Sequence, residues 1–306
     1  MAASGGKKAI LAAFFANLGI CIAKLIGFGI TGASSMLSEA IHSAADTGNQ
    51  GLLLLGSNRA RREADEDHPF GYARERYFWA FVVAVVLFTL GSVFAIYEGI
   101  HKIQHPEAVV SPAVALSILG VAIVLESWSL RTAVVESNHV RGDVGWWRFL
   151  RTAKIPELPV VLLEDMGAMV GLVVAFGAVT TSAVTGDGVY DGIGSVIIGL
   201  ILGVIAIFLC IEMKSLLIGE SATPEVRRAI DAALADSDSV ERLIHSRTEH
   251  LGPDEILLAA KVEFRADMDF ADVAAAIDEV EARVRAAVPA VKLCYIEPAV
   301  YVPGPA

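Results

Sequence analysis

The chain has 306 residues, of which 55% are hydrophobic and 19% are charged, and its mean hydropathy is +0.58. Such a chain is too apolar for one soluble domain, and its net charge of −11 argues against nucleic acid as a partner. The three cysteines, Cys21, Cys210 and Cys294, are scattered without a CxxC pair, which argues against a disulfide framework and a thiolate metal cage.

Apolar runs dominate the first two thirds of the chain, and each is near or above the roughly 20 residues that a helix needs to cross a bilayer. They cover residues 9–31, 36–57, 77–102, 112–135, 158–184 and 190–213. From about Glu220 onward the sequence is charged and alternating, with 17 acidic and 9 basic residues. We therefore expect an α-helical membrane protein with a six-helix transmembrane domain at 1–217 and a soluble C-terminal domain at 218–306.

Lysine and arginine gather before the first run, between the second and third, and between the fourth and fifth. The other connections, TGASS, HPEAVVSP and TGDG, contain neither residue. By the positive-inside rule both termini face the cytoplasm, which predicts a multi-pass protein of the cell membrane. The basic start resembles a signal peptide, but no convincing cleavage pattern follows it, so we expect an uncleaved first span.

The second run carries a polar stripe, because residues three and four apart share one face of a helix. Its members are Glu39, His42, Asp46 and Asn49. Histidine nitrogen with carboxylate oxygen is a ligand set for Zn²⁺ first, with Mn²⁺, Fe²⁺, Co²⁺ or Cd²⁺ as alternatives. The alternative interpretation is that His42 and Asp46 hydrogen bond to each other and to neighbouring helices.

Two consecutive acids, Glu164 and Asp165, stand inside the fifth run, where unpaired carboxylates are costly and need a cation. They project about 100° apart on a helix, so at most one is ideally aimed at a shared site. Gly167, Ala168 and Gly171 make a small-residue face that lets a neighbouring helix approach closely, as a site shared with the second helix requires.

Other charges lie inside the runs at Lys24, Glu98 and Glu126. Interhelical pairing or snorkelling is the common explanation for such residues, and a proton relay is the alternative. Asp191 begins the sixth run, where we expect it to stabilise the helix N-terminus.

At this point the sequence resembles the cation diffusion facilitator family, and most of all its zinc transporter nine branch. The resemblance rests on six spans with a cytoplasmic tail, on HSAADTGNQGLLLLG, on DEDHPFGYARERYFWA and on LLED, and it covers nearly the whole chain. It implies exchange of Zn²⁺ for protons at four ligands, two from the second helix and two from the fifth. His42, Asp46 and Asp165 match three of these ligands by position.

The fourth ligand of the family pattern, a histidine in the fifth helix, is Val161 in this chain. Glu164 is the nearest substitute, with Asn49 or water behind it. A more oxygen-rich site would weaken the preference for Zn²⁺ over Mn²⁺ or Fe²⁺.

The resemblance also implies a second ion site in the loop between the second and third helices. Asp65 and His68 match its first two ligands, but Tyr72 replaces the later histidine. The alternative is a charge network that fixes the loop. It would join Asp65, Glu66 and Asp67 to Arg61, Arg62, Arg74 and Arg76.

The tail predicts the order helix, strand, strand, helix, strand, at 224–237, 240–252, 254–264, 269–288 and 291–302. It resembles the ferredoxin-like domain with which such transporters form homodimers. Strand positions comparable to the family's tail ligands hold Lys261, Tyr295 and Glu297, so we expect a largely metal-free tail with His245 and His250 on its surface.

Two rival functions remain. An intramembrane aspartyl protease is suggested by the Tyr190–Asp191 dipeptide, but its GxGD partner is missing, as are HExxH and GxSxG. A membrane metal sensor that binds without transporting is suggested by the missing histidine at position 161. We expect a transporter rather than an enzyme.

Overall fold

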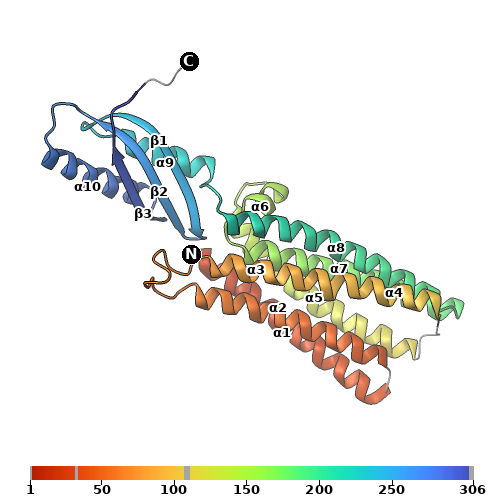
Figure 1. Ribbon diagram of the computed structural model, residues 1–306. Coiled ribbons are helices and arrows are strands. Elements are labelled where there is room, and N and C mark those ends of the chain that lie inside the picture. The colour runs from red at the N-terminus through yellow and green to blue at the C-terminus, as the bar shows by residue number, and fades with distance from the viewer. Residues whose placement is uncertain (1, 32–33, 107–110, 303–306) are drawn as a thin grey trace. The chain divides into compact units, whose positions relative to one another are not determined.

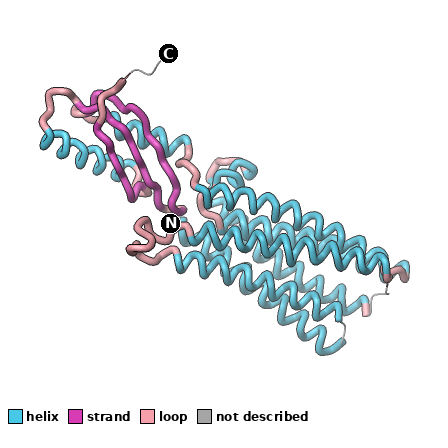
Figure 2. The backbone as a smooth tube through the Cα atoms, viewed as in Figure 1, coloured by secondary structure: helices cyan, strands magenta, loops and turns pink. Residues whose placement is uncertain are grey.

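The computed structural model describes residues 2–31, 34–106 and 111–302, except for the side chains of residues 2–9, 24, 27–31 and 34–42. The chain forms two compact units. One contains Met1–Arg62 and Glu75–Lys214, and the other contains Glu63–Arg74 and Ser215–Ala306. Figure 2 shows that the strands belong to the second unit, while helices make up the first.

Long helices lie side by side in the first unit (Figure 1). They are α1 (Ala2–Thr31), α2 (Ser34–Arg59), α5 (Pro112–Arg141), α7 (Glu157–Thr185) and α8 (Val189–Ile218), with the short α6 (Trp146–Thr152) before α7. A further long helix is built from α3 (Glu75–Val86), the π-helical segment η1 (Leu87–Val93) and α4 (Phe94–Gln104). α5 is followed by Gly142 (φ 54°) and α7 by Gly186 (φ 74°), positive-φ positions that favour glycine.

Four of these helices are long and apolar enough to cross a membrane, counting the described residues alone. They are Glu75–Gln104, Pro112–Arg141, Glu157–Thr185 and Val189–Ile218, and α1 contains a shorter apolar stretch at Ile10–Ala23. The six apolar runs of the sequence each coincide with one long helix, which confirms the predicted class of helical membrane protein.

The second unit has the predicted αββαβ order. It contains α9 (Pro224–Ala235), β1 (Val240–Gly252), β2 (Glu255–Phe264), α10 (Phe270–Ala287) and β3 (Val291–Pro298). The sheet has the order β1-β2-β3, in which β1 and β2 are antiparallel and β2 and β3 are parallel. Thr223 caps α9 by accepting from the Val226 amide, and Asp269 caps α10 by accepting from the Asp272 amide.

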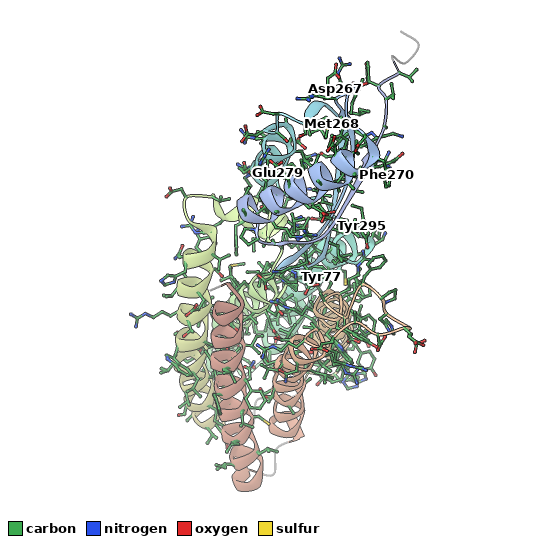
Figure 3. The ribbon with its side chains drawn as sticks, turned by 90° about the vertical axis from the view of Figure 1, so that its left-hand side faces the viewer. Tyr77, Asp267, Met268, Phe270, Glu279 and Tyr295 are labelled. Atoms are coloured by element: carbon green, nitrogen blue, oxygen red, sulfur yellow. The ribbon has the colours of Figure 1, made fainter. Side chains whose placement is uncertain are left out.

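One face of this sheet forms the core of the unit. Ile256, Leu258 and Val262 alternate along β2 and are buried against Ile230 of α9 and Val280 of α10. Full burial of each such side chain contributes about 2 kcal/mol. Neither α9 nor α10, the helices described in the tail, covers the other face of the sheet, and Tyr295 of β3 is 54% exposed there (Figure 3).

Candidate functional site

Glu164 lies in the interior of the helical bundle, 4% exposed, and faces α2. Asn49 donates from Nδ2 to Glu164 Oε1 at 3.0 Å, and Gln50 donates from Nε2 to Oε2 at 2.8 Å. Asn17 of α1 donates in turn to Gln50 Oε1 at 3.4 Å. Two amides from α2 therefore hold both oxygens of one buried carboxylate, which fixes its orientation and leaves lone pairs for a further partner.

Asp165, the next residue, is 1% exposed and faces α5 instead. Ser129 donates from Oγ to Asp165 Oδ2 at 2.6 Å, whereas Oδ1 has no hydrogen-bond partner within the described part of the chain. A buried carboxylate oxygen without a donor is costly in a membrane interior, and a proton or a cation would satisfy it. The two consecutive acids thus connect α7 to two different helices, as their 100° separation requires.

Asp46 and Glu126 complete the acidic cluster, by which we mean Asp46, Glu126, Glu164 and Asp165. Asp46 of α2 lies close enough to both α7 acids for repulsion between their negative charges, and Glu126 lies close enough to Glu164 for the same repulsion. Asp46, Glu126 and Glu164 line one cavity of about 180 Å³. Three helices therefore bring acids to the interior of the bundle.

The described residues contain no group of three His, Cys, Asp or Glu side chains arranged to hold a metal ion. The side chains of His42 and Lys24 lie outside the described residues, so the predicted pairing of His42 with Asp46 stays a prediction. Val161, at the position of the expected histidine, is fully buried. The nearby Asn49 leaves its Oδ1 without a partner in the described structure, so this amide oxygen is the second unsatisfied acceptor beside the cluster.

The sequence did not single out Asn17, Gln50 or Ser129 as parts of the site. Ser129 lies one turn after Glu126 on α5. The pattern ExxS inside an apolar span was therefore the signal that could have pointed to Ser129 beside Glu126. Neutral amides carry no comparable signal, because their partners depend on which helices meet.

Gly167 and Gly171 do make a close helix contact, but their neighbour is α8 rather than α2. A Cβ added at Gly167 would lie 2.8 Å from Ile205, and one added at Gly171 would lie 3.4 Å from Ile198. The expected close contact of these glycines with the second helix is therefore wrong. α7 contacts α2 instead through the hydrogen bonds of Glu164 with Asn49 and Gln50.

A buried ion pair lies at one end of the bundle. Arg76 of α3 donates from Nε and Nη2 to the two carboxylate oxygens of Glu157 at 2.6 and 2.8 Å, and the two side chains are 10% and 2% exposed. Two parallel hydrogen bonds of this kind fix α3 to the start of α7.

The loop residues Asp65, His68 and Tyr72 come together in the second unit. The Tyr72 hydroxyl donates to Asp65 Oδ2 at 2.6 Å, and the His68 amide donates to Oδ1 at 2.8 Å. The Tyr72 hydrogen bond is the main reason why the pKa of Asp65 lies below its usual range. The Tyr72 phenol thus stands at the position where the family resemblance implies a third metal ligand.

Two arginines of the alternative charge network pair with acids outside the loop. Arg74 pairs with Glu249 of β1, and Arg76 pairs with Glu157. In the tail, His245 is exposed as expected, but His250 is buried with its Nδ1 3.1 Å from the Gly252 carbonyl. His250 is therefore not a surface histidine.

Comparisons with known proteins identify the family of the chain. The model of the cation efflux transmembrane domain matches residues 10–218. The human mitochondrial proton-coupled zinc antiporter SLC30A9 is 32% identical over 268 residues, which are 87% of this chain and 46% of that protein. Metal tolerance protein C4 of Arabidopsis thaliana is 29% identical over 267 residues, 86% of this chain and 58% of the relative.

A shorter similarity reaches the zinc transporter ZitB of Pectobacterium atrosepticum, with 30% identity over 151 residues, 46% of this chain and 47% of that one. The chain spans about half the length of the SLC30A9 proteins that it matches. The matched domain covers the long helices of the first unit from residue 10 of α1 onward, and it contains the whole acidic cluster. The chain belongs to the cation efflux family, the cation diffusion facilitators, in the branch of the SLC30A9 zinc antiporters.

Proposed function

We propose that the chain is a transporter that exchanges Zn²⁺ for protons across a membrane. The acidic cluster is the observation that carries this proposal, because carboxylates from α2, α5 and α7 line one cavity inside the helical bundle. Of these helices, α5 and α7 are long and apolar enough to cross a bilayer. Ionisable groups at that depth mark ion pathways. The names of the relatives, a proton-coupled zinc antiporter for SLC30A9 and a zinc transporter for ZitB, support the same substrate.

Competition for the same lone pairs couples the two ions in this mechanism. Metal ligands bind in their deprotonated form, so Zn²⁺ entering the cluster displaces protons from His42 and from the carboxylates. Protons arriving from the other side of the membrane compete for the same atoms and release the metal. Glu164 and Asp46 are the ligands best placed for this exchange, because both line the cavity.

The basic loops favour an orientation with both termini in the cytoplasm of a cell-membrane protein. In this orientation we propose that the metal enters the cluster from the cytoplasm and leaves on the other side of the membrane. The tail is proposed to form a homodimer, and the protein is proposed to act as a transporter and not as an enzyme. Val161 makes the site richer in oxygen, so Mn²⁺, Fe²⁺ and Co²⁺ are the alternative substrates to compare.

Zinc uptake by proteoliposomes with an imposed pH gradient tests the function. We expect uptake by the wild type and none by the double variant Asp46→Ala and Asp165→Ala. The matched control is Asp143→Ala, an exposed aspartate outside the helices, which should transport normally. Transport that persists in the double variant would contradict the site, and zinc binding without flux in the wild type would indicate a sensor.

A further inference from the structure

The cavity beside the acidic cluster continues to residues that the mechanism above does not use. Its described lining includes Glu98 and Lys102 of α4 and Ser195 of α8, in addition to Asp46, Glu126 and Glu164. Glu98 and Lys102 are half-buried. A cavity of about 180 Å³ has room for several water molecules, and its polar groups are concentrated in two places with apolar side chains between them.

One face of the helix formed by η1 and α4 follows the cavity along its length. Leu87, Gly91, Phe94, Glu98 and Lys102 line the cavity at intervals of three or four residues. At a rise of about 1.5 Å per residue, this face covers roughly 20 Å. This face of η1 and α4 therefore extends from beside the acidic cluster to the end of the bundle at which α4 ends.

Among the described residues, the α7 wall contributes no charge along this stretch. Beyond Glu164, the lining residues of α7 are small or apolar, among them Gly167, Gly171 and Ala175. In the described lining, Glu98 is thus the carboxylate that lies between the acidic cluster and the Lys102 end. A cation crossing an apolar passage needs such a group, provided that it binds weakly enough to release the ion again.

An ion pair lies at the far end of this face. Lys102 donates from Nζ to Asp191 Oδ2 at 3.0 Å, and the side chains are 31% and 23% exposed. Asp191 is in the first turn of α8, as expected, but its carboxylate binds Lys102, and the residue that accepts from the first amide of α8 is Asp187. The ammonium group of Lys102 carries a charge that repels an approaching cation.

Close backbone packing holds α4 and α8 together beside this ion pair. A Cβ added at Gly99 would lie 2.7 Å from the Gly192 carbonyl oxygen, and one at Gly199 would lie 2.9 Å from the Ser92 carbonyl oxygen. Ser92 also donates from Oγ to the Gly199 carbonyl at 2.8 Å. Because the two backbones leave so little space, a path at this end has to open through side chains, and Lys102 and Asp191 are the described charged pair there.

We propose that a divalent cation moves between the acidic cluster and the α4–α8 end through this cavity, with Glu98 as its transit ligand and the Lys102–Asp191 ion pair as the closure. The proposal rests on the proposed transport function and adds a residue and a route to it. Glu98 lies one turn from Lys102 on the same face, with a rise of about 6 Å between them. A cation bound at Glu98 therefore repels the Lys102 ammonium directly, which favours opening of the ion pair.

The first test measures Glu98→Gln in zinc proteoliposomes together with zinc binding to the purified protein. We expect the maximal flux to fall about tenfold and the zinc affinity of the purified protein to stay within about twofold of the wild type. Glu98→Asp should keep most of the flux, because it keeps the carboxylate. Glu136→Gln, on α5 and outside the cavity lining, is the matched control and should transport like the wild type.

Each outcome of this test decides between the proposals. Wild-type flux in Glu98→Gln overturns the transit role, and so does a loss of zinc affinity as large as that of Asp46→Ala, because Glu98 would then belong to the binding site itself. A wild type that binds zinc and carries no flux overturns the transport function, and the transit role falls with it. Failure of this inference alone therefore looks different from failure of the proposed function.

The second test addresses the closure. Lys102→Ala should let zinc leak down its own gradient without a pH gradient, at a rate several times that of the wild type. The charge swap Lys102→Asp with Asp191→Lys should restore the low zinc leak of the wild type, because it rebuilds the ion pair. Lys102→Ala liposomes that leak no more than the wild type would show that the ion pair does not close the path.

Discussion

Replacing Gln50 by leucine tests whether the amides of α2 position Glu164 for metal binding. Gln50 is fully buried, and its Nε2 lies 2.8 Å from Glu164 Oε2. Leucine keeps a similar volume and removes the donor, so one oxygen of a buried carboxylate loses its partner. A hydrogen bond to a charged group contributes about 1.5–3 kcal/mol, and its loss leaves the carboxylate free to turn away from the cavity.

This free energy sets the size of the effect, because about 1.4 kcal/mol corresponds to a tenfold change in affinity. We expect the zinc dissociation constant of Gln50→Leu to rise about 10- to 100-fold, the range seen when a residue that orients a metal ligand is removed. Isothermal titration calorimetry on the purified protein in detergent at a fixed pH measures the change.

Two control variants make the result specific. Gln104→Leu makes the same substitution at the exposed last residue of α4 and should bind zinc like the wild type. Asn17→Leu removes only the 3.4 Å contact to Gln50 and should weaken binding less than Gln50→Leu does. An affinity within about twofold of the wild type in Gln50→Leu would refute the role of the amides.

Three further predictions concern other parts of the chain. Arg76→Met leaves Glu157 buried without its partner and should cost about 3–5 kcal/mol of stability in thermal denaturation, and adding Glu157→Gln should recover most of it. Burial raises the pKa of the Cys294 thiol to about 11. With the other two cysteines changed to serine, maleimide should therefore label the folded protein at pH 8 about 100-fold more slowly than the unfolded protein, and faster as the pH rises towards 11. Equal rates would contradict this. Tyr72→His places an imidazole beside Asp65 and should add one bound zinc per chain, as counted by metal analysis, and Asp65→Ala in the same background should remove it.

Three of the four acids of the cluster could be singled out from the sequence as candidate ligands, and their role as metal ligands stays a prediction. Asp46, Glu164 and Asp165 stand out because an acid in an apolar run is rare and costly. The αββαβ tail was predictable for a related reason, since its alternating and 3.6-residue patterns each fit one type of element.

Other features depend on which helices meet, and no local pattern encodes that. Gln50 contributes to the candidate site because α1 and α7 lie next to it, and the sequence around Gln50 does not show this. Asp191 looks like a helix cap until α4 ends beside it and presents Lys102. The π-helical segment Leu87–Val93 continues the apolar run, and its Thr89, Gly91 and Ser92 are residues that also occur in α-helical spans, so the sequence does not distinguish it from an α-helix.

The two consecutive acids of α7 connect ion binding to helix packing. Glu164 is held by amides from α2, and Asp165 is held by Ser129 from α5. A movement of α7 against α2 has to break the first contacts, and a movement against α5 has to break the second. In the proposed mechanism, a zinc ion bound in the cluster would draw on the same oxygen lone pairs as these donors, and so would a proton. Exchange of one ion for the other would therefore change the contacts that hold α7 in place, which is what a coupled transporter requires of its binding site.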